Sequence, residues 1–546
     1  MSRSTRRSLF LILMVLTLSA FAGGMLGKGV KADAQPTESR LRTFGQVMAL
    51  LEDHFVGDLE SHDLVESAIQ GMLQTLDPHS NYLTRNNFSE MKDEQRGKFF
   101  GLGIQINKPG PDRPLTIIAP IEDTPAFRVG LHAGDIIYKI EGEETSDLTL
   151  HQAVRKLKGD RGTEVTVTIQ RPSEGSAFDV TLVRDEIPTH SIRVSFMIRP
   201  EVGYIRISNF TSTTAEELDE ALRTLGEQGM TKLVLDLRSN PGGLLDQAVE
   251  VSKRFLPSGK LLVFTRGRVR GSDEDYVASN HTERFDASLV VLLDRHSASA
   301  SEIVAGAIQD HDRGLLVGER SFGKGLVQRV VPLRNGGAVA LTTAKYYTPS
   351  GRLIQRDYTD LDDYFLDPRN EEETEDTLRV APEEPIEENR EVFYTDAGRE
   401  VYGGGGITPD YIVPSMKLST LLSRLLRQNM IFDYAVQYAE GHTELEKGFT
   451  LDDPELKPFK AFLEAREFGF SEEAFHENLG DIRRRIRAQV AKVRWGESAE
   501  SLILMEGDTQ IQKALILFEE AAQLATAGEE GVRRRKAELR PPKPSI

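Results

Sequence analysis

Serine and lysine residues occur in this sequence in a pattern that could support nucleophilic catalysis. Ser297, Ser299 and Ser301 alternate with alanines in Ser-Ala-Ser-Ala-Ser-Glu, and Phe-Gly-Lys-Gly places Lys324 downstream. A serine hydroxyl is a weak nucleophile that needs a base, and a lysine shielded from water can be that base once its pKa falls. The pattern therefore predicts acyl-transfer chemistry that requires neither a metal nor a cofactor.

The residues around the serines favour a strand, a tight turn and a helix. The apolar run Leu289–Asp294 is typical of a buried strand, and apolar residues repeat at helical spacing from Ile303 to Ile308. Such a turn presents a hydroxyl at a helix N-terminus, where free N–H groups favour developing negative charge. A second apolar run, 314–318, leads into the loop that carries Lys324.

A phosphate-binding loop is one alternative interpretation of this loop. Gly318, Gly323 and Lys324 fit the P-loop spacing, but Gly325 stands where a Ser or Thr should hold Mg²⁺. The residues that follow, 326–331, favour a strand rather than the helix whose N-terminus would hold phosphates.

Two further interpretations concern the serines themselves. Asp294 and His296 are two positions apart on the predicted strand and could serve a Ser–His–Asp triad, although known triads draw their members from separate segments. The serines could also be no more than a helix cap. Capping explains one serine but not the glycine-flanked lysine.

These motifs resemble those of the carboxyl-terminal processing (tail-specific) serine peptidases. In that family the lysine of a Ser–Lys dyad lies 25 positions after the serine, which here relates Ser299 to Lys324. The resemblance implies that Ser299 is the nucleophile, Lys324 the general base and Gln328 the partner of the lysine. Glu302, Asp310 and Ser321 also match family positions, with weaker roles.

A glycine pair is the candidate oxyanion hole. The strand predicted at 232–237 ends in Arg-Ser-Asn-Pro-Gly-Gly, and glycines at a strand-to-helix turn expose backbone N–H groups. The resemblance implies that Gly242 and Gly243 bind the oxyanion together with the Ala300 N–H. A turn that needs glycine only for a positive φ is the competing interpretation for one of the two.

Residues 98–186 resemble a PDZ domain, a peptide-binding module. Gly101, Leu102, Gly103 and Ile104 resemble the loop whose N–H groups bind a terminal carboxylate, and Ile104 would open the strand on which a peptide pairs. The helix expected at 148–157 would form the other wall of the groove.

The remaining divisions follow composition and apolar periodicity. Residues 35–97 and 416–546 are predicted to be helical regions that flank a catalytic domain at 187–415, with an acidic excursion at about 357–391. The resemblance implies an α/β, crotonase-like β–β–α spiral for the catalytic core. The apolar helical faces of 416–546 need a partner surface, which could be the core of the same chain, a second protomer or an adaptor protein, and we expect self-association.

Residues 1–34 are predicted to direct export. Arg3, Arg6 and Arg7 precede an apolar run over residues 9–26, and Ala32-Asp33-Ala34 offers a cleavage site, so the segment is either a signal peptide or a membrane anchor. The rest of the chain would lie in a bacterial periplasm or cell envelope, and it would be anchored to the inner membrane if the segment is not cleaved.

Composition limits the classes of partner. The 546 residues carry a net charge of −18, which argues against nucleic acid, and the absence of cysteine excludes disulfides and thiol catalysis. The sequence predicts an exported serine endopeptidase that cuts proteins near their free C-termini. A non-catalytic envelope scaffold that binds C-terminal peptides is the alternative.

Overall fold

The structure is a computed structural model in which the chain divides into two compact units after Leu76. It describes residues 37–111, 113–172, 174–279, 284–360, 364, 390–452 and 456–538, with side chains described as far as residue 533. The predicted export segment, 1–34 with its apolar run at 9–26, lies outside the described residues. So does most of the predicted acidic excursion at 357–391.

The first unit contains two amphipathic helices, α2 (Thr37–His54) and α3 (Ser61–Gln74). The predicted apolar stripe of α2 is present, but no residue of this helix is buried. Phe44, Val47, Leu50 and Phe55 are each more than two-fifths exposed. Across the described ranges, no helix combines the length and the apolar character needed to cross a bilayer.

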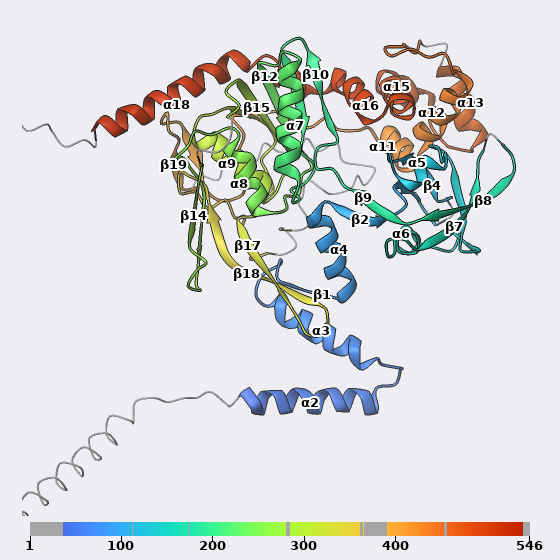
Figure 1. Ribbon diagram of the computed structural model, residues 1–546, viewed down its shortest axis with the longest axis horizontal. Helices are drawn as coiled ribbons and strands as arrows, with labels where there is room; N and C mark the ends of the chain where they lie inside the picture. The colour runs from blue at the N-terminus through green and yellow to red at the C-terminus, as the bar shows by residue number, and fades with distance from the viewer. Residues whose placement is uncertain are drawn as a thin grey trace, which may run out of the picture. The chain divides into compact units, whose positions relative to one another are not determined.

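A six-stranded sheet forms the centre of the second unit (Figure 1). Its order is β10 (Val194–Arg199), β11 (Val202–Arg206), β12 (Lys232–Asp236), β15 (Ser288–Leu293), β16 (Leu315–Gly318) and β21 (Tyr411–Ile412). β10 is antiparallel to β11, and the other neighbours are parallel. The strands predicted from apolar runs at 232–237, 289–294 and 314–318 are confirmed.

Helices cover both faces of this sheet. Its odd-numbered residues Leu233, Leu235, Leu289 and Val291 share a core with α7 (Thr214–Glu227), α8 (Leu245–Lys253) and α9 (Ala300–Asp310). Its other face packs against α17 (Thr509–Ala514) and α18 (Phe518–Glu538). A strand buried on both faces has no polar face to alternate with, which explains the uninterrupted apolar runs.

A second sheet combines strands from distant parts of the chain. It consists of β1 (Asn81–Leu83), β13 (Leu261–Gly267), β14 (Glu274–Val277), β17 (Leu326–Pro332) and β18 (Ala338–Tyr347). Both β1 and β17 pair with Ala338–Ala340, so they lie on opposite edges of β18. Within the region predicted to be helical at 35–97, the structure therefore has a strand, followed by α4 (Arg85–Arg96).

The PDZ-like segment forms a sheet of its own. Its strands are β3 (Ile104–Asn107), β4 (Thr116–Pro120), β5 (Ile136–Ile140), β6 (Glu143–Glu144), β7 (Glu164–Gln170) and β8 (Ala177–Val183), with α5 (Pro125–Arg128) and α6 (Leu150–Leu157). β3 is an edge strand. β2 (Lys98–Gly101) pairs with β9 (Asp185–Pro188) where the segment begins and ends.

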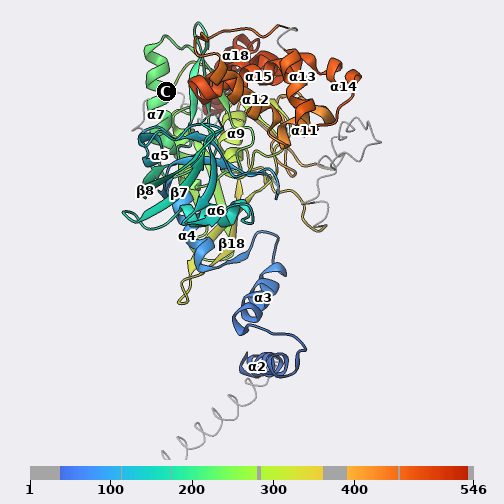
Figure 2. The same ribbon diagram turned by 90° about the vertical axis from the view of Figure 1, so that its right-hand side faces the viewer.

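The C-terminal region is helical, as predicted. Figure 2 shows one cluster of helices, which are α11 (Thr420–Arg427), α12 (Met430–Gly441), α13 (Leu456–Ala465), α14 (Glu472–Glu477) and α15 (Leu479–Trp495). α16 (Glu497–Leu504) and a 3₁₀ turn, Met505–Gly507, lead from this cluster to α17.

The apolar faces of this region are covered by the same chain. Leu422 and Leu425 belong to a core within the helical cluster, whereas Ile511, Leu517 and Phe518 pack on the central sheet. These faces therefore need no second protein, which removes the argument that led us to expect self-association. The α/β core, the inserted small domain and the helical C-terminal region are as predicted, whereas the N-terminal region also contributes the strand β1.

Candidate active site

Ser299 occupies a strained turn between β15 and α9. Its φ is 54° and its ψ is −111°, a conformation that a residue with a side chain rarely adopts and that tends to occur at functional sites. Ser297 and Ser301 are fully buried and donate to the carbonyls of Leu237 (2.8 Å) and Asn240 (3.0 Å). The Ser299 hydroxyl donates to no group in the described part of the chain, so it differs from both neighbours.

Lys324 lies in the loop between β16 and β17. Its Nζ donates to Gln328 Oε1 at 3.0 Å, and Gln328 Nε2 donates in turn to the His79 carbonyl at 2.7 Å. Burial lowers the pKa of Lys324, and attraction to Glu302 and Asp77 opposes the shift only in part. The amine bonds to Gln328, and no hydrogen bond joins it to Ser299 among the residues described.

Glu302 joins the Ser299 turn to the Lys324 loop. Its carboxylate accepts the backbone N–H groups of Ser299 (2.8 Å), Gly323 (2.7 Å) and Lys324 (2.9 Å), and the hydroxyl of Ser321 at 2.5 Å. The side chain is fully buried, and this burial raises its pKa to about 7 although the four donors favour the charged form. One carboxylate thus fixes the backbone on both sides of the candidate site.

Tyr346, a residue that sequence reasoning did not single out, ties the same two segments together. Its hydroxyl lies 3.1 Å from the Ser299 carbonyl and is also hydrogen-bonded to the Lys324 carbonyl. The side chain is 1% exposed. Nothing local marks it, because an aromatic residue in a half-buried strand looks like ordinary core.

The two predicted oxyanion glycines differ in how they are placed. A Cβ on Gly242, whose φ is 99°, would lie 2.7 Å from Ser299 Cβ and 2.9 Å from Ala300 N, so only glycine fits there. Its N–H already donates to Asn240 Oδ1 at 2.9 Å. In the described chain, the N–H groups of Gly243 and Ala300 have no acceptor, and they remain available to bind an anion.

Two alternative interpretations of this stretch are not supported, whereas the third is met in part, since Ser299 is the N-cap residue of α9. β17 begins at Leu326, so a strand rather than a helix follows Lys324, contrary to a P-loop. The His296 ring is exposed, and the Asp294 carboxylate accepts the His296 backbone N–H and not a ring N–H. A triad built on this pair therefore lacks its central hydrogen bond.

The four candidate peptide-binding residues lie outside the two sheets next to Ser299, where the chain passes from β2 into the PDZ sheet. Gly101 ends β2, and Ile104 begins the edge strand β3. Leu102 is buried, and Gly103 has a φ of 77°. The N–H groups of Leu102 and Gly103 have no acceptor in the part of the chain that is described, as a carboxylate-binding loop requires.

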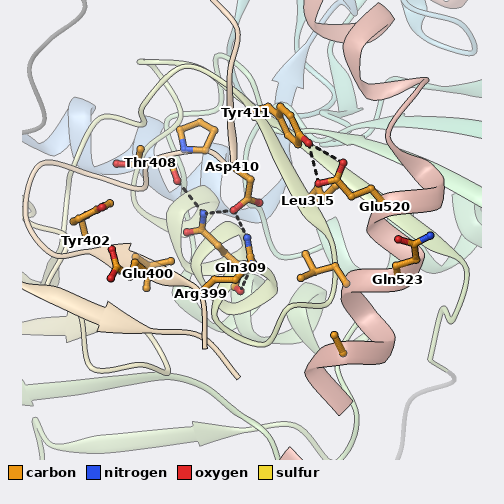
Figure 3. Close-up of a pocket in the computed structure, with 14 residues that line it drawn as sticks. Gln309, Leu315, Arg399, Glu400, Tyr402, Thr408, Asp410, Tyr411, Glu520 and Gln523 are labelled. Carbon is orange, nitrogen blue, oxygen red and sulfur yellow. Dashed lines mark hydrogen bonds and ion pairs between the residues drawn. The ribbon is translucent and has the colours of Figure 1, made fainter. Parts of the chain in front are cut away.

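A cavity of about 570 Å³ lies at the other end of α9 from Ser299 (Figure 3). Gln309 donates to the Thr408 carbonyl and to Asp410, which also pairs with Arg399. One side of the cavity is lined by β20 (Glu400–Tyr402), which pairs with β19 (Val392–Tyr394). The other side is lined by α18. The polar groups at its centre, Gln309, Arg399 and Asp410, therefore bind one another and hold the end of α9 to the segment at 399–410.

Models of known families match four parts of the chain. Peptidase family S41 matches residues 201–363, and a PDZ domain matches residues 116–171. The C-terminal helical domain of a probable PDZ-protease matches residues 421–477. The N-terminal domain of the activating protease CtpB matches residues 24–87.

Curated relatives extend this similarity over most of their length. A carboxy-terminal-processing protease of Bartonella bacilliformis is 42% identical over 334 residues, which cover 59% of this chain and 74% of that protein. A probable CtpA-like serine protease of Staphylococcus saprophyticus is 32% identical over 359 residues, which cover 64% of this chain and 71% of that protein. Among solved structures, a photosystem II D1 C-terminal processing protease shares 28% identity with this chain. The match covers 57% of this chain and 83% of that protein, with a TM-score of 0.33.

Proposed function

Because this chain belongs to the carboxy-terminal-processing serine proteases of peptidase family S41, we propose that Ser299 is its nucleophile and Lys324 its general base. The observation that carries the assignment is the strained Ser299 turn, whose backbone shares the Glu302 carboxylate with the loop of a half-buried lysine. Two segments 25 residues apart in sequence are thereby held as one unit.

In the proposed reaction Ser299 Oγ attacks the scissile carbonyl while Lys324 Nζ accepts its proton. The lysine side chain, now bonded to Gln328, has to approach Ser299 for this step, and such contacts commonly tighten only once substrate is bound. The protonated amine then returns the proton to the leaving nitrogen, and water hydrolyses the acyl-enzyme.

The developing oxyanion would be bound by the N–H groups of Gly243 and Ala300. Both groups lack an acceptor within the described residues, and Ala300 begins α9, whose dipole favours negative charge at that end. Gly242 contributes close packing against Ser299 instead of a donor, because its own N–H is bound to Asn240.

The PDZ domain is proposed to bind the free C-termini of protein substrates. The supporting observations are that β3 is an edge strand and that the N–H groups of Leu102 and Gly103 beside it have no acceptor among the described residues. A peptide would pair with β3 and place its carboxylate in this loop. Export is proposed from residues 1–34, with action in the bacterial periplasm or envelope.

A serine-reactive fluorophosphonate tests the catalytic assignment. The full chain should be labelled at Ser299, as located by peptide mass spectrometry, and Ser299→Ala should abolish labelling without changing the melting temperature. Labelling at another serine would overturn the assignment. A folded chain that is not labelled at all would point to a non-catalytic scaffold.

A further inference from the structure

The turn Asp77-Pro78-His79-Ser80 precedes β1 and is tightly constrained by its first residue. Asp77 Oδ1 accepts the N–H groups of His79 (2.8 Å) and Ser80 (2.7 Å), and Asp77 Oδ2 accepts the Ser80 hydroxyl at 2.8 Å. A short acidic side chain that bonds to backbone two and three residues ahead fixes the turn. The direction of the His79 carbonyl is therefore set by Asp77.

The same turn is fastened to the strand next to the candidate base. Ser80 is 2% exposed, and its Oγ accepts the backbone N–H of Thr342 in β18 at 3.1 Å. Thr342 is the residue that pairs with Gln328 in the ladder between β17 and β18. The turn consequently lies beside Gln328, across β18 from its strand.

The hydrogen bonds leave only one orientation for the Gln328 amide. The His79 carbonyl can only accept, so it must face Nε2, which turns Oε1 toward an N–H of the Lys324 amine. A reversed amide would place two acceptors together at His79. The carbonyl of His79 thus determines which atom Lys324 meets.

Aromatic rings close this region on another side. The His79 ring is 2.6 Å from the Tyr364 hydroxyl, and Tyr364 packs edge-on against Phe322, two residues before Lys324. Burial and the charge of Lys324 lower the pKa of His79 to about 4, which keeps this ring neutral near pH 7. His79 therefore contributes its carbonyl and its bulk to the site and adds no positive charge.

We propose that the Asp77–Ser80 turn is a positioning element for the general base, because its His79 carbonyl fixes the Gln328 amide that holds Lys324. The inference rests on the proposed function of Ser299 and Lys324. It assigns a role in catalysis to a turn that lies some 220 residues before the nucleophile in sequence. Asp77 acts at a distance through backbone geometry and does not contact substrate.

Two substitutions of Asp77 separate positioning from charge. Asp77→Ala removes all three turn bonds, and we expect the rate of fluorophosphonate labelling at Ser299 to fall about 10- to 100-fold, since small displacements of a catalytic group have effects of that size. Asp77→Asn keeps an oxygen that accepts both N–H groups, and its rate should stay within about threefold of the natural chain at its own optimal pH.

The pH profile provides a readout that a purely structural role would not move. The titratable groups that face Lys324 are Glu302 from α9, Asp77 and His79 from the turn, and the Tyr346 and Tyr364 hydroxyls. Because the Asp77 carboxylate raises the pKa of Lys324, its loss in Asp77→Asn should lower that pKa. The midpoint of the labelling rate should then move to lower pH.

Asp273→Ala is the matched control. Asp273 also fixes a turn of the same sheet, between β13 and β14, where its carboxylate accepts the Gly267 N–H at 2.9 Å. The Asp273→Ala variant should be labelled at Ser299 at the natural rate. The proposal is overturned if Asp77→Asn keeps the natural pH midpoint and Asp77→Ala, melting as a folded protein, keeps the natural rate. If Asp77→Ala does not fold, Ser80→Ala takes its place, since it removes the bonds of Ser80 Oγ to Asp77 Oδ2 and to the Thr342 N–H, and a natural labelling rate in that folded variant overturns the proposal. A natural chain that is not labelled at Ser299 instead contradicts the proposed function, a separate outcome.

Discussion

Several side chains in this site act by forming hydrogen bonds with backbone N–H and carbonyl groups. Glu302 binds three N–H groups from two segments, and Tyr346 binds a carbonyl from each of the same two. The serine cluster and Lys324 stand out by residue type, and the choice of Ser299 within the cluster follows from the resemblance to the family; both roles stay predictions. Tyr346 and the His79 carbonyl could not be predicted, because their roles depend on backbone contacts made only after folding.

Lys324 should set the pH dependence of catalysis. Only the neutral amine can accept the Ser299 proton, so kcat/KM should rise with pH through one ionisation that lies below the ordinary lysine value of 10.5, because burial lowers this pKa. Lys324→Ala and Lys324→Arg should each lower kcat/KM about 100- to 10,000-fold, since guanidinium stays protonated.

The control for this prediction is Lys232→Ala, which removes a lysine at the start of β12 and should leave the profile unchanged. Near-normal turnover by folded Lys324→Arg would show that another group is the base.

Tyr346→Phe should reduce turnover more than substrate affinity. The Lys324 carbonyl loses its donor, which costs about 1–3 kcal/mol when a buried polar group is left unpaired, and the loop that carries the base is loosened. We expect kcat to fall about tenfold with KM little changed. Tyr347→Phe is the control, since it removes a hydroxyl from the adjacent residue of β18. It should change neither kcat nor the free energy of unfolding measured in urea.

At the scale of elements, the apolar runs determined what could be predicted. The strands now seen as β12, β15, β16 and β17 and the helix α9 follow from hydrophobic runs and spacing that need no partner to be recognised. β1 was missed because three residues are too few for a periodic signal, and it pairs with β18, more than 250 positions away. Its pairing brings the Asp77–Ser80 turn to the site.

The turn between β12 and α8 should tolerate no side chain at Gly242. Gly242→Ala combines a positive φ with a Cβ that would lie 2.7 Å from Ser299 Cβ, so turnover should fall at least about 100-fold. Gly229→Ala is the matched control, since its φ is 87° and its Cβ would meet nothing within 4 Å.

Both variants should lose about 1–2 kcal/mol of unfolding free energy from backbone strain, as measured in urea. Only Gly242→Ala should lose turnover, and equal kinetics for the two would contradict the close packing described at Ser299.

At the scale of the whole molecule, composition and motifs indicated which kinds of domain the chain contains, but not how it covers its own surfaces. The apolar helical faces near Leu425 and Phe518 show the same periodic pattern in the sequence. The face with Leu425 belongs to a separate helical core, whereas the face with Phe518 covers the central sheet. That difference arises from long-range packing, for which no local pattern exists.

Peptide binding to the PDZ domain should depend on a free terminal carboxylate. Amidation removes the charge that the N–H groups of Leu102 and Gly103 would bind, so an apolar peptide should lose about 10- to 100-fold in affinity. Calorimetric titration of the full chain with the two forms measures this loss. Acetylation of the peptide N-terminus should change nothing, and equal affinity of the acid and the amide would argue against the carboxylate loop.

The complete burial of α9 has a consequence for amide hydrogen exchange. All 11 of its residues are buried between two layers, whereas no residue of α2 is buried. The α9 amides from Ser301 onward, which are hydrogen-bonded, should therefore exchange only when the second unit unfolds globally, while those of α2 exchange through local opening. A ligand that binds only the folded unit, at about 100 times its Kd, should slow exchange in α9 about 100-fold, wherever on that unit it binds.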